Sequence, residues 1–296
     1  MWTYVTPKTP VTEAGNRREL LELLERMPRE YPFGKVLYPD DTVVPPPRSN
    51  TPDRARVIFG LVGARPILIP SKGQARTIRL GPGDVLWLHP RVWHLGSRDV
   101  ACTTLQLTFD PDYTSGQVKQ WRAAPGTRPQ ELVRLNYYTH AHINGTADRI
   151  VQTLNDLAFL AGRRGAEASL LRALIRMVRQ EMAVPPSKEG KARSTWQALC
   201  DYAREHFHEP INRDSVARAF GLHPNHVSRL FRQQGGQRFS AYLTGLRMEH
   251  AAALQQRRHL TVKELAAHCG FRDERYFIRV FRRHHGTTPG RYGRGT

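Results

Sequence analysis

The amino-acid sequence predicts two domains, an N-terminal domain built mainly from β-strands and a C-terminal domain built from helices. Three observations support this. Short β-type runs fill residues from about 31 to 140, helical periodicity follows them, and a helix–turn–helix pattern occurs twice in the C-terminal third. The 296 residues are enough for each domain to bury its own core. We therefore expect an N-terminal domain over 1–183, a linker over 184–193 and a C-terminal domain over 194–296.

The N-terminal domain is expected to be a small antiparallel barrel or sandwich. It contains runs such as ARVIFGLVG, DVLWLH and ACTTLQLTF, separated by turn-forming stretches such as SKGQ and GPGD. Runs of β-branched and aromatic residues between such turns are typical of all-β domains. A short helix, Glu19–Met27, is expected before the strands.

Two amphipathic helices are expected after the strands, over about residues 146–183. Apolar residues recur there at helical intervals, and the stretch GRRG separates two sets of them. The first stripe is Ile150, Leu154, Leu157 and Ala161, and the second is Leu171, Leu174, Ile175, Val178 and Met182. The stripes could cover the β domain, or they could meet the same stripes of a second subunit and make the protein a homodimer. The two uses are compatible with each other.

The stretch VPPSKEGKARS, Val184–Ser194, contains two prolines and a glycine among mostly polar residues. Such a composition is typical of a linker. Ser194 and Gln197 have the spacing of a capping box, which predicts a helix from Ser194 onward.

The C-terminal domain contains an internal repeat. VARAFGLHPNHVSRLFRQQGGQRFSAY, residues 216–242, matches LAAHCGFRDERYFIRVFRRHHGTTPGRY, residues 265–292. Each copy has a helical pattern, a glycine (Gly221 or Gly270) that allows positive φ in a turn, and a second helical pattern. Two helix–turn–helix units are expected, over about residues 212–234 and 261–285.

In a helix–turn–helix unit the second helix enters the major groove of DNA. Val227, Leu230 and Phe231 in the first copy, and Tyr276 or Phe277 with Val280 and Phe281 in the second, should form the core. The outward-facing side chains are expected to contact bases. These are Asn225, His226, Ser228, Arg229, Arg272, Glu274, Arg275 and Arg279. Four arginines suit phosphate contacts. They are Arg232, Arg282, Arg283 and Arg291.

The charge agrees with a nucleic-acid partner. The formal net charge is +19, and residues 191–296 alone hold 19 Lys and Arg against 8 Asp and Glu. Such an excess favours binding to a polyanion, because neutralised phosphates release counterions. The sequence shows no transmembrane or secretory segment, and its three cysteines are widely spaced, so a cytoplasmic location is expected.

The C-terminal region resembles the AraC/XylS family of bacterial transcription regulators. The most specific match is F-x-R-x-F-R-R-x-x-G-x-x-P-x-x-Y, Phe277–Tyr292. The resemblance implies two helix–turn–helix units joined by a long helix, here Ser240–Arg257, with double-stranded DNA as the partner. RNA polymerase as a further partner is implied only by this resemblance, and by no residue pattern in the sequence.

The N-terminal stretch GPGDVLWLHPRVWH, Gly81–His94, resembles the effector-binding, cupin-like jelly roll of the same family. The resemblance implies a pocket for a small molecule, such as a sugar or a related metabolite. Candidate pocket residues are Arg56, Trp87, His89, Trp93, His94, Thr104 and Gln106. Packing in the core is the alternative for each tryptophan.

Two other functions share some of these sequence features. A cupin-type metal enzyme would need a His-x-His pair and a carboxylate on earlier strands, but GLVGARPILIPSKGQARTIRL contains no His, Asp or Glu. We therefore expect no metal, no cofactor and no enzymatic activity. A non-specific nucleoid-type DNA binder would share the charge but would not need two recognition helices of different sequence.

Overall fold

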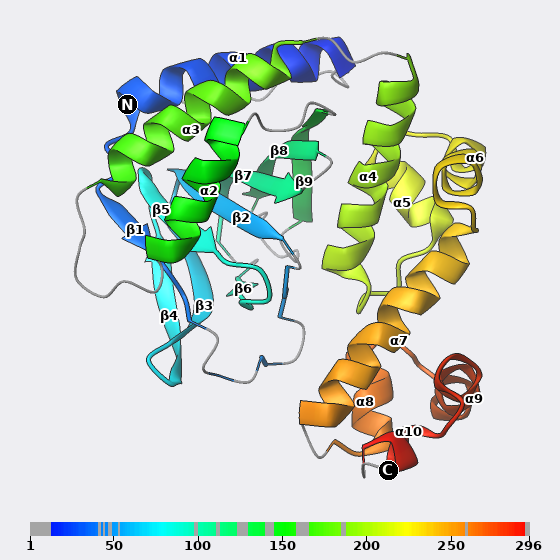
Figure 1. The fold of residues 1–296 in the computed structure, drawn as a ribbon. Coiled ribbons are helices and arrows are strands. Elements are labelled where there is room, and N and C mark those ends of the chain that lie inside the picture. Colours follow the sequence, from blue (N-terminus) through cyan, green and yellow to red (C-terminus); the bar gives the residue numbers. More distant parts are fainter. Residues whose placement is uncertain are drawn as a thin grey trace. The chain divides into compact units, whose positions relative to one another are not determined.

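The computed structural model describes residues 13–40, 43, 45–46, 49–52, 54–97, 100–110, 113–122, 130–139, 145–157, 166–184, 188–257 and 260–293. The chain forms two compact units (Figure 1). The main division between them falls between Ser194 and Thr195, within the first turns of the helix α4, Lys188–His206. Each unit is described by itself. Within the described ranges, no helix is long and apolar enough to cross a membrane.

The first unit combines two β-sheets with three helices. Its helices are α1 (Glu13–Glu30), α2 (Gly145–Leu157) and α3 (Glu167–Met182). Its strands are β1 (Lys35–Leu37), β2 (Ala55–Val62), β3 (Arg65–Ser71), β4 (Gln74–Leu80), β5 (Asp84–Leu88), β6 (Leu95–Gly96), β7 (Cys102–Asp110), β8 (Tyr113–Arg122) and β9 (Gln130–Thr139). One sheet has the strand order β1-β5-β2-β7-β8-β9 and the other β4-β3-β6. Helix α1 is longer than the predicted Glu19–Met27. Its first residues are mostly polar and carry no apolar periodicity, so the sequence pattern does not show that they are helical.

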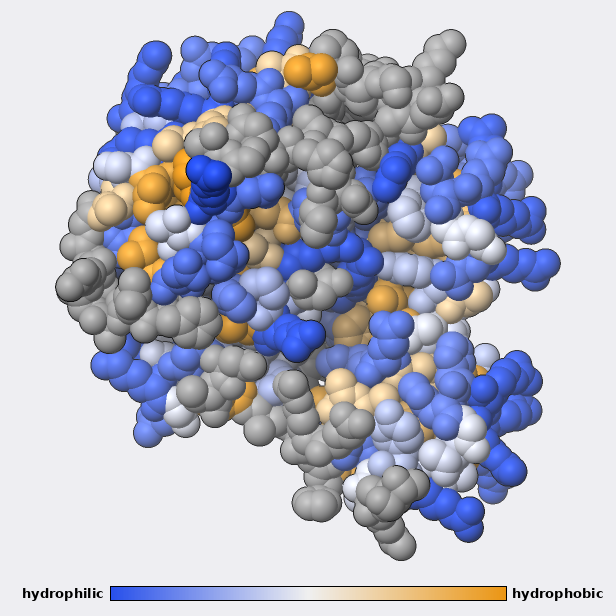
Figure 2. All heavy atoms as spheres, viewed as in Figure 1, coloured by the Kyte–Doolittle hydropathy of each residue, from blue (hydrophilic) through white to orange (hydrophobic). Residues whose placement is uncertain are grey.

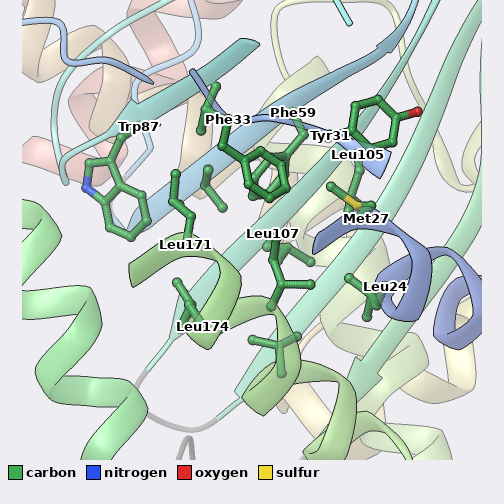
Figure 3. Close-up of a cluster of buried hydrophobic side chains, with 14 of the residues drawn as sticks. Leu24, Met27, Tyr31, Phe33, Phe59, Trp87, Leu105, Leu107, Leu171 and Leu174 are labelled. Atoms are coloured by element: carbon green, nitrogen blue, oxygen red, sulfur yellow. The ribbon is translucent and has the colours of Figure 1, made fainter. Parts of the chain in front are cut away.

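Successive side chains of a strand point to opposite faces of a sheet, so each strand of the larger sheet can pack on two sides. The helices pack on one face, and the smaller sheet packs on the other. Val57 and Phe59 of β2 and Trp87 of β5 pack with the helices α1, α2 and α3. Figure 3 shows Trp87 and Leu107 near Leu171 of α3, and Leu105 near Met27 of α1. On the other face, Ile58 packs with apolar residues of the smaller sheet and of β5. These are Ile67, Ile69, Ile78, Leu80, Leu86 and Leu88.

The apolar stripes of α2 and α3 face their own sheet. Leu154 and the five residues of the second stripe are fully buried in the core of the first unit, and Ile150 and Leu157 pack against it. Ala161 lies outside the described residues. The stripes therefore cover the β domain, which is one of their two expected uses. A homodimer through residues 146–183 stays a prediction.

The second unit is all helical. Its helices are α4 (Lys188–His206), α5 (Arg213–Ala219), α6 (Pro224–Gly235), α7 (Phe239–Arg257), α8 (Val262–His268), α9 (Glu274–His285) and α10 (Pro289–Tyr292). The β-rich first unit and the helical second unit agree with the predicted two-part fold. Helix α4 begins within the segment 184–193 predicted as a linker. The physical reason is that Lys, Glu, Ala and Arg between residues 188 and 193 favour a helix more than the single glycine disfavours it.

Each helix–turn–helix unit has an aromatic centre in its own core. The Phe231 ring lies 5.2 Å from that of Phe239 and 5.3 Å from that of Tyr242. In the second repeat, Phe281 lies 5.8 Å from Phe277 and 5.5 Å from Tyr292. The two copies of the sequence repeat thus pack their aromatic residues in a similar way. The long helix α7 joins the two copies.

Candidate nucleic-acid interface

The first helix–turn–helix unit consists of α5 and α6, and local hydrogen bonds fix where both helices begin. The Asn212 side chain accepts a hydrogen bond from the Ser215 backbone N–H at 2.8 Å, and the Asn212 N–H donates to the Ser215 hydroxyl at 2.9 Å. Gly221 turns the chain with φ +63°, and the His223 side chain caps α6, which begins at Pro224. These features fix the residue at which α6 begins.

The second unit consists of α8 and α9 and is built in the same way. Thr261 and Glu264 form a capping box, and two hydrogen bonds from Thr261 hold the pKa of the Glu264 carboxyl below its ordinary value. Gly270 provides the turn with φ +77°, and Asp273 caps α9. Each recognition helix therefore has a fixed start and presents one face to the core and one to the solvent.

The outer face of α6 carries most of the residues that the sequence assigned to bases in the first unit. Val227, Leu230 and Phe231 are buried, as expected. The side chains on the opposite face line an open pocket with a volume of about 370 Å³. Its lining consists of Asn225, Ser228, Arg229 and Arg232, joined by Arg213 of α5 and by Gln233. Sequence periodicity missed Arg213, because it lies on the preceding helix and only the fold brings it beside α6.

His226 and Arg229 of α6 form a pair. A terminal guanidinium nitrogen of Arg229 lies 2.8 Å from Nδ1 of His226. Since arginine has only donors, Nδ1 accepts, so the neutral ring carries its proton on Nε2. Burial and the Arg229 charge both lower the pKa of His226. The pair therefore holds the Arg229 side chain in one direction. The Nε2–H of His226 is then the one donor of the ring.

The outer face of α9 is strongly basic. Phe277, Val280 and Phe281 are buried. Exposed side chains occupy the other side of the helix and the turn before it. They are Arg272, Glu274, Arg275, Arg279, Arg282 and Arg283. Arg291 of α10 is also exposed. In Figure 2, hydrophilic side chains gather over α6 and over α9.

Tyr276 is a surface residue, although its position in the sequence pattern suits the core as well as the surface. It is 47 % exposed, one of two large hydrophobic residues so exposed among those described, whereas Phe277 is buried. The guanidinium carbon of Arg279 lies 5.2 Å from the centre of the Tyr276 ring. The spacing to Val280 and Phe281 suits both positions 276 and 277, so periodicity alone could not separate them.

The candidate effector residues of the first unit do not all lie together. Trp87 is fully buried on the helix-covered face of the sheet, and its indole N–H donates to the Asn155 side chain of α2 at 2.9 Å. Trp93 is also fully buried and donates to the backbone carbonyl of Val43 at 2.6 Å. Both tryptophans therefore fit the alternative of core packing. His89 is half-buried, and His94 is buried and pairs through its backbone with Asn50.

Arg56, Thr104 and Gln106 do lie together, on the sheet face away from the helices. The register of β2, β7 and β8 places other buried polar residues beside them. We call this group the polar sheet face, and it comprises Arg56, Thr104, Gln106, Thr108, Ser115, Gln117 and Lys119. All seven are buried, and Gln106 donates to Gln117 at 3.4 Å. The β8 residues were not among the candidates, because the sequence pattern does not single out the strand that contains them.

The described residues contain no group of three or more His, Cys, Asp or Glu side chains suited to hold a metal ion. The three cysteines are buried, and burial raises the pKa of the Cys269 thiol to about 12. A buried thiol with a raised pKa is a poor nucleophile.

Comparisons with known proteins agree with these features. A family model described as a helix-turn-helix domain matches residues 216–295. The HTH-type transcriptional regulator YpdC of Escherichia coli K12 is 28% identical over 88% of this chain and 89% of its own length. YijO of the same organism, also an HTH-type transcriptional regulator, is 30% identical over 73% of this chain and 74% of its own length.

A solved structure from Chromobacterium violaceum, a regulator with an AraC-type DNA-binding domain, is 26% identical. The match covers 34% of this chain and 94% of that chain, with a TM-score of 0.31. The family match and the two regulators aligned along most of their length confirm the resemblance seen in the sequence. The chain belongs to the AraC/XylS family and is a transcriptional regulator with a DNA-binding helix–turn–helix domain.

Proposed function

We propose that this regulator recognises a specific duplex sequence with α6 and α9 and that a small molecule bound in the first unit controls it. In this proposal residues 194–296 bind DNA and residues 1–183 form the effector domain, with a cupin-like jelly roll as its architecture. The observation that carries the proposal is the pair of capped helices, each with a buried apolar face and an exposed polar, arginine-bearing face.

Each recognition helix would lie in one major groove, and the two grooves would be about one helical turn, ~34 Å, apart. Arginine suits guanine through two hydrogen bonds, and Asn225 suits adenine. Arg229, Arg275 and Arg279 would contact bases, together with His226, Ser228, Arg272 and Glu274. Arg232, Arg282, Arg283 and Arg291 would contact phosphates, which orient the protein without carrying sequence information.

The polar sheet face supports the small-molecule part of the proposal. Buried polar atoms normally have hydrogen-bond partners. Within the part of the chain that the structure describes, the hydroxyls of Thr104 and Ser115 and the indole N–H of Trp121 are buried without one. These groups, with the amides of Gln106 and Gln117, suit a ligand rich in hydroxyl groups, such as a sugar or a related metabolite.

Selection of binding sites from a random duplex library tests the DNA part. Full-length protein at about 0.15 M salt should enrich a motif with two blocks about one turn apart. Tight binding without enrichment would instead identify a non-specific nucleoid-type binder. Adding neutral sugars and sugar acids to the same protein tests the effector part, with thermal unfolding as the readout. A ligand should raise the unfolding temperature, and Ser115→Ala should reduce that shift, whereas Arg76→Gln, an exposed change on β4, should not.

A homodimer would let the protein bind two such sites. Because the apolar stripes of α2 and α3 are covered, such a dimer would use the outer faces of these helices. Val184, which follows α3 and is 64% exposed, would lie in that interface. Sedimentation of the full-length protein tests this, and a monomer at micromolar concentration would contradict it. A contact with RNA polymerase and a cytoplasmic location are further parts of the proposal that rest on family membership.

A further inference from the structure

The two helix–turn–helix units are connected by more than the helix α7. The loop that follows α4 lies against both the middle of α7 and the turn of the second unit. Arg247 of α7 donates one hydrogen bond to the carbonyl of Phe207 and another to the carbonyl of Glu209, each at 2.8 Å. This loop leads directly into α5, so Arg247 links the joining helix to the entrance of the first unit.

The second unit contacts the same loop through Gly270. A Cβ atom at this position would lie 2.9 Å from the backbone oxygens of both Phe207 and His208. That distance is shorter than a carbon–oxygen contact allows, so only glycine permits this approach of the turn to the loop. Gly270 therefore has two functions, a positive φ in the turn and a close contact between the two units.

Arg247 also contacts the second unit directly. Its guanidinium carbon lies 5.4 Å from the centre of the Phe271 ring, and Phe271 belongs to the turn between α8 and α9. Burial lowers the pKa of Arg247 from its ordinary value, but the group stays protonated at neutral pH. A single side chain thus holds the loop before α5 and the turn before α9 in one arrangement.

The helix α7 alone is a weaker connection. It contains Gly245 in its interior, two residues before Arg247, and glycine adds conformational freedom to a helix. A second connection beside that glycine limits the bending that would change the separation of α6 and α9.

We infer that Arg247, with Gly270, fixes the distance and angle between the two recognition helices, so that the protein discriminates between DNA sites by the spacing of their two blocks. This inference rests on the proposed recognition of DNA by both α6 and α9. Arg247 is a positioning residue, because it is half-buried and its contacts are to the protein backbone and Phe271.

Spacing variants of the selected site test the inference with the full-length protein. One inserted base pair moves one block by about 3.4 Å and rotates it by roughly 35° about the DNA axis. The wild-type protein should lose affinity by about tenfold or more when one base pair is inserted or deleted, since contacts of one block are lost. Arg247→Gln should show a penalty of at most about threefold, because the second unit can then follow its displaced block.

Four further variants keep the test independent of simple destabilisation. Glu249→Gln changes a charge at an exposed position of the same helix and should keep the wild-type spacing penalty. Gly270→Ala should reduce the penalty. Gly221→Ala is its matched control, because that residue has a similar φ, +63°, but nothing within 4 Å of the added Cβ. If Arg247→Gln does not fold, Arg247→Lys replaces it in the test. Lysine keeps the charge and one donor group, so this variant should give a spacing penalty between those of the wild type and of a protein without the contact.

A wild-type protein that tolerates the insertion would overturn the inference, as would Arg247→Gln or Gly270→Ala folding normally with an unchanged penalty. A selected motif with only one block would instead contradict the proposed function, because it would show that only one recognition helix contacts DNA.

Discussion

The Arg279 guanidinium lies over the ring of Tyr276 on the exposed face of α9, with 5.2 Å between the guanidinium carbon and the ring centre. The pair combines a donor that suits guanine with an apolar ring that suits the methyl group of thymine. Because Tyr276 is 47 % exposed and also lies 6.0 Å from the Phe271 ring, its ring is held against the protein without being buried.

Tyr276→Ala should therefore lower affinity for the selected site by about 1 kcal/mol, the sum of a lost cation–π contact and a lost apolar contact. Tyr276→Phe keeps the ring and should bind nearly as the wild type does. Fluorescence anisotropy on the selected duplex and on single-base variants of it measures both. Equal binding by Tyr276→Ala and the wild type would show that the ring lies outside the interface.

Arg229→Ala and Arg279→Ala should each cost about 1–3 kcal/mol and relax the preference at particular base pairs. Repeating the site selection with each variant shows which positions lose information. Since Arg229 belongs to α6 and Arg279 to α9, the two variants should affect different blocks of the motif. A uniform loss across all sequences would assign the arginines to the backbone instead.

Arg283→Ala should weaken binding to every sequence by a similar factor. Arg283 is exposed in the last turn of α9, on the side away from the buried Phe281. A phosphate contact predicts that the slope of log K against log salt falls by about 1. A titration between about 0.05 and 0.2 M salt measures that slope, and an unchanged slope would remove Arg283 from the phosphate contacts.

The helix–turn–helix units could be predicted from sequence because their signals are local. Caps such as Asn212 and Thr261, the positive-φ glycines and the buried Phe231 and Phe281 each act within a few residues. The effector candidates were harder, because which sheet face a residue occupies depends on strands far away in sequence. Trp87 alternates with Leu86 in a strand buried on both faces, so periodicity could not show that Trp87 faces the helices.

His250 predicts that stability depends on pH. It is half-buried in α7, its ring 4.6 Å from that of Phe207, and burial together with His268 lowers its pKa to about 4. The unfolded chain binds a proton at about pH 6.5, whereas the folded chain stays neutral at His250 down to about pH 4. Stability from this group is therefore fully present above pH 6.5 and is lost as the pH falls from there toward 4.

Lowering the pH from about 7.5 to 5 should cost the folded state about 2 kcal/mol through His250. Urea denaturation of the full-length protein at both pH values measures this cost, and His250→Gln should remove most of the difference attributable to the second unit. A pH dependence unchanged by the substitution would assign it to other histidines.

Gly245→Ala should stabilise the second unit. Gly245 lies in the interior of α7, and a Cβ atom added there meets nothing within 4 Å. Glycine in a helix interior costs about 0.5–1 kcal/mol relative to alanine, because it loses more backbone freedom on folding. The substitution should therefore raise the free energy of unfolding by that amount in urea denaturation. Gly221→Ala, at a turn with φ +63°, should have the opposite effect, because alanine disfavours that conformation. A loss of stability in Gly245→Ala would mean that α7 is not helical at this residue or that another part of the molecule occupies the space beside it.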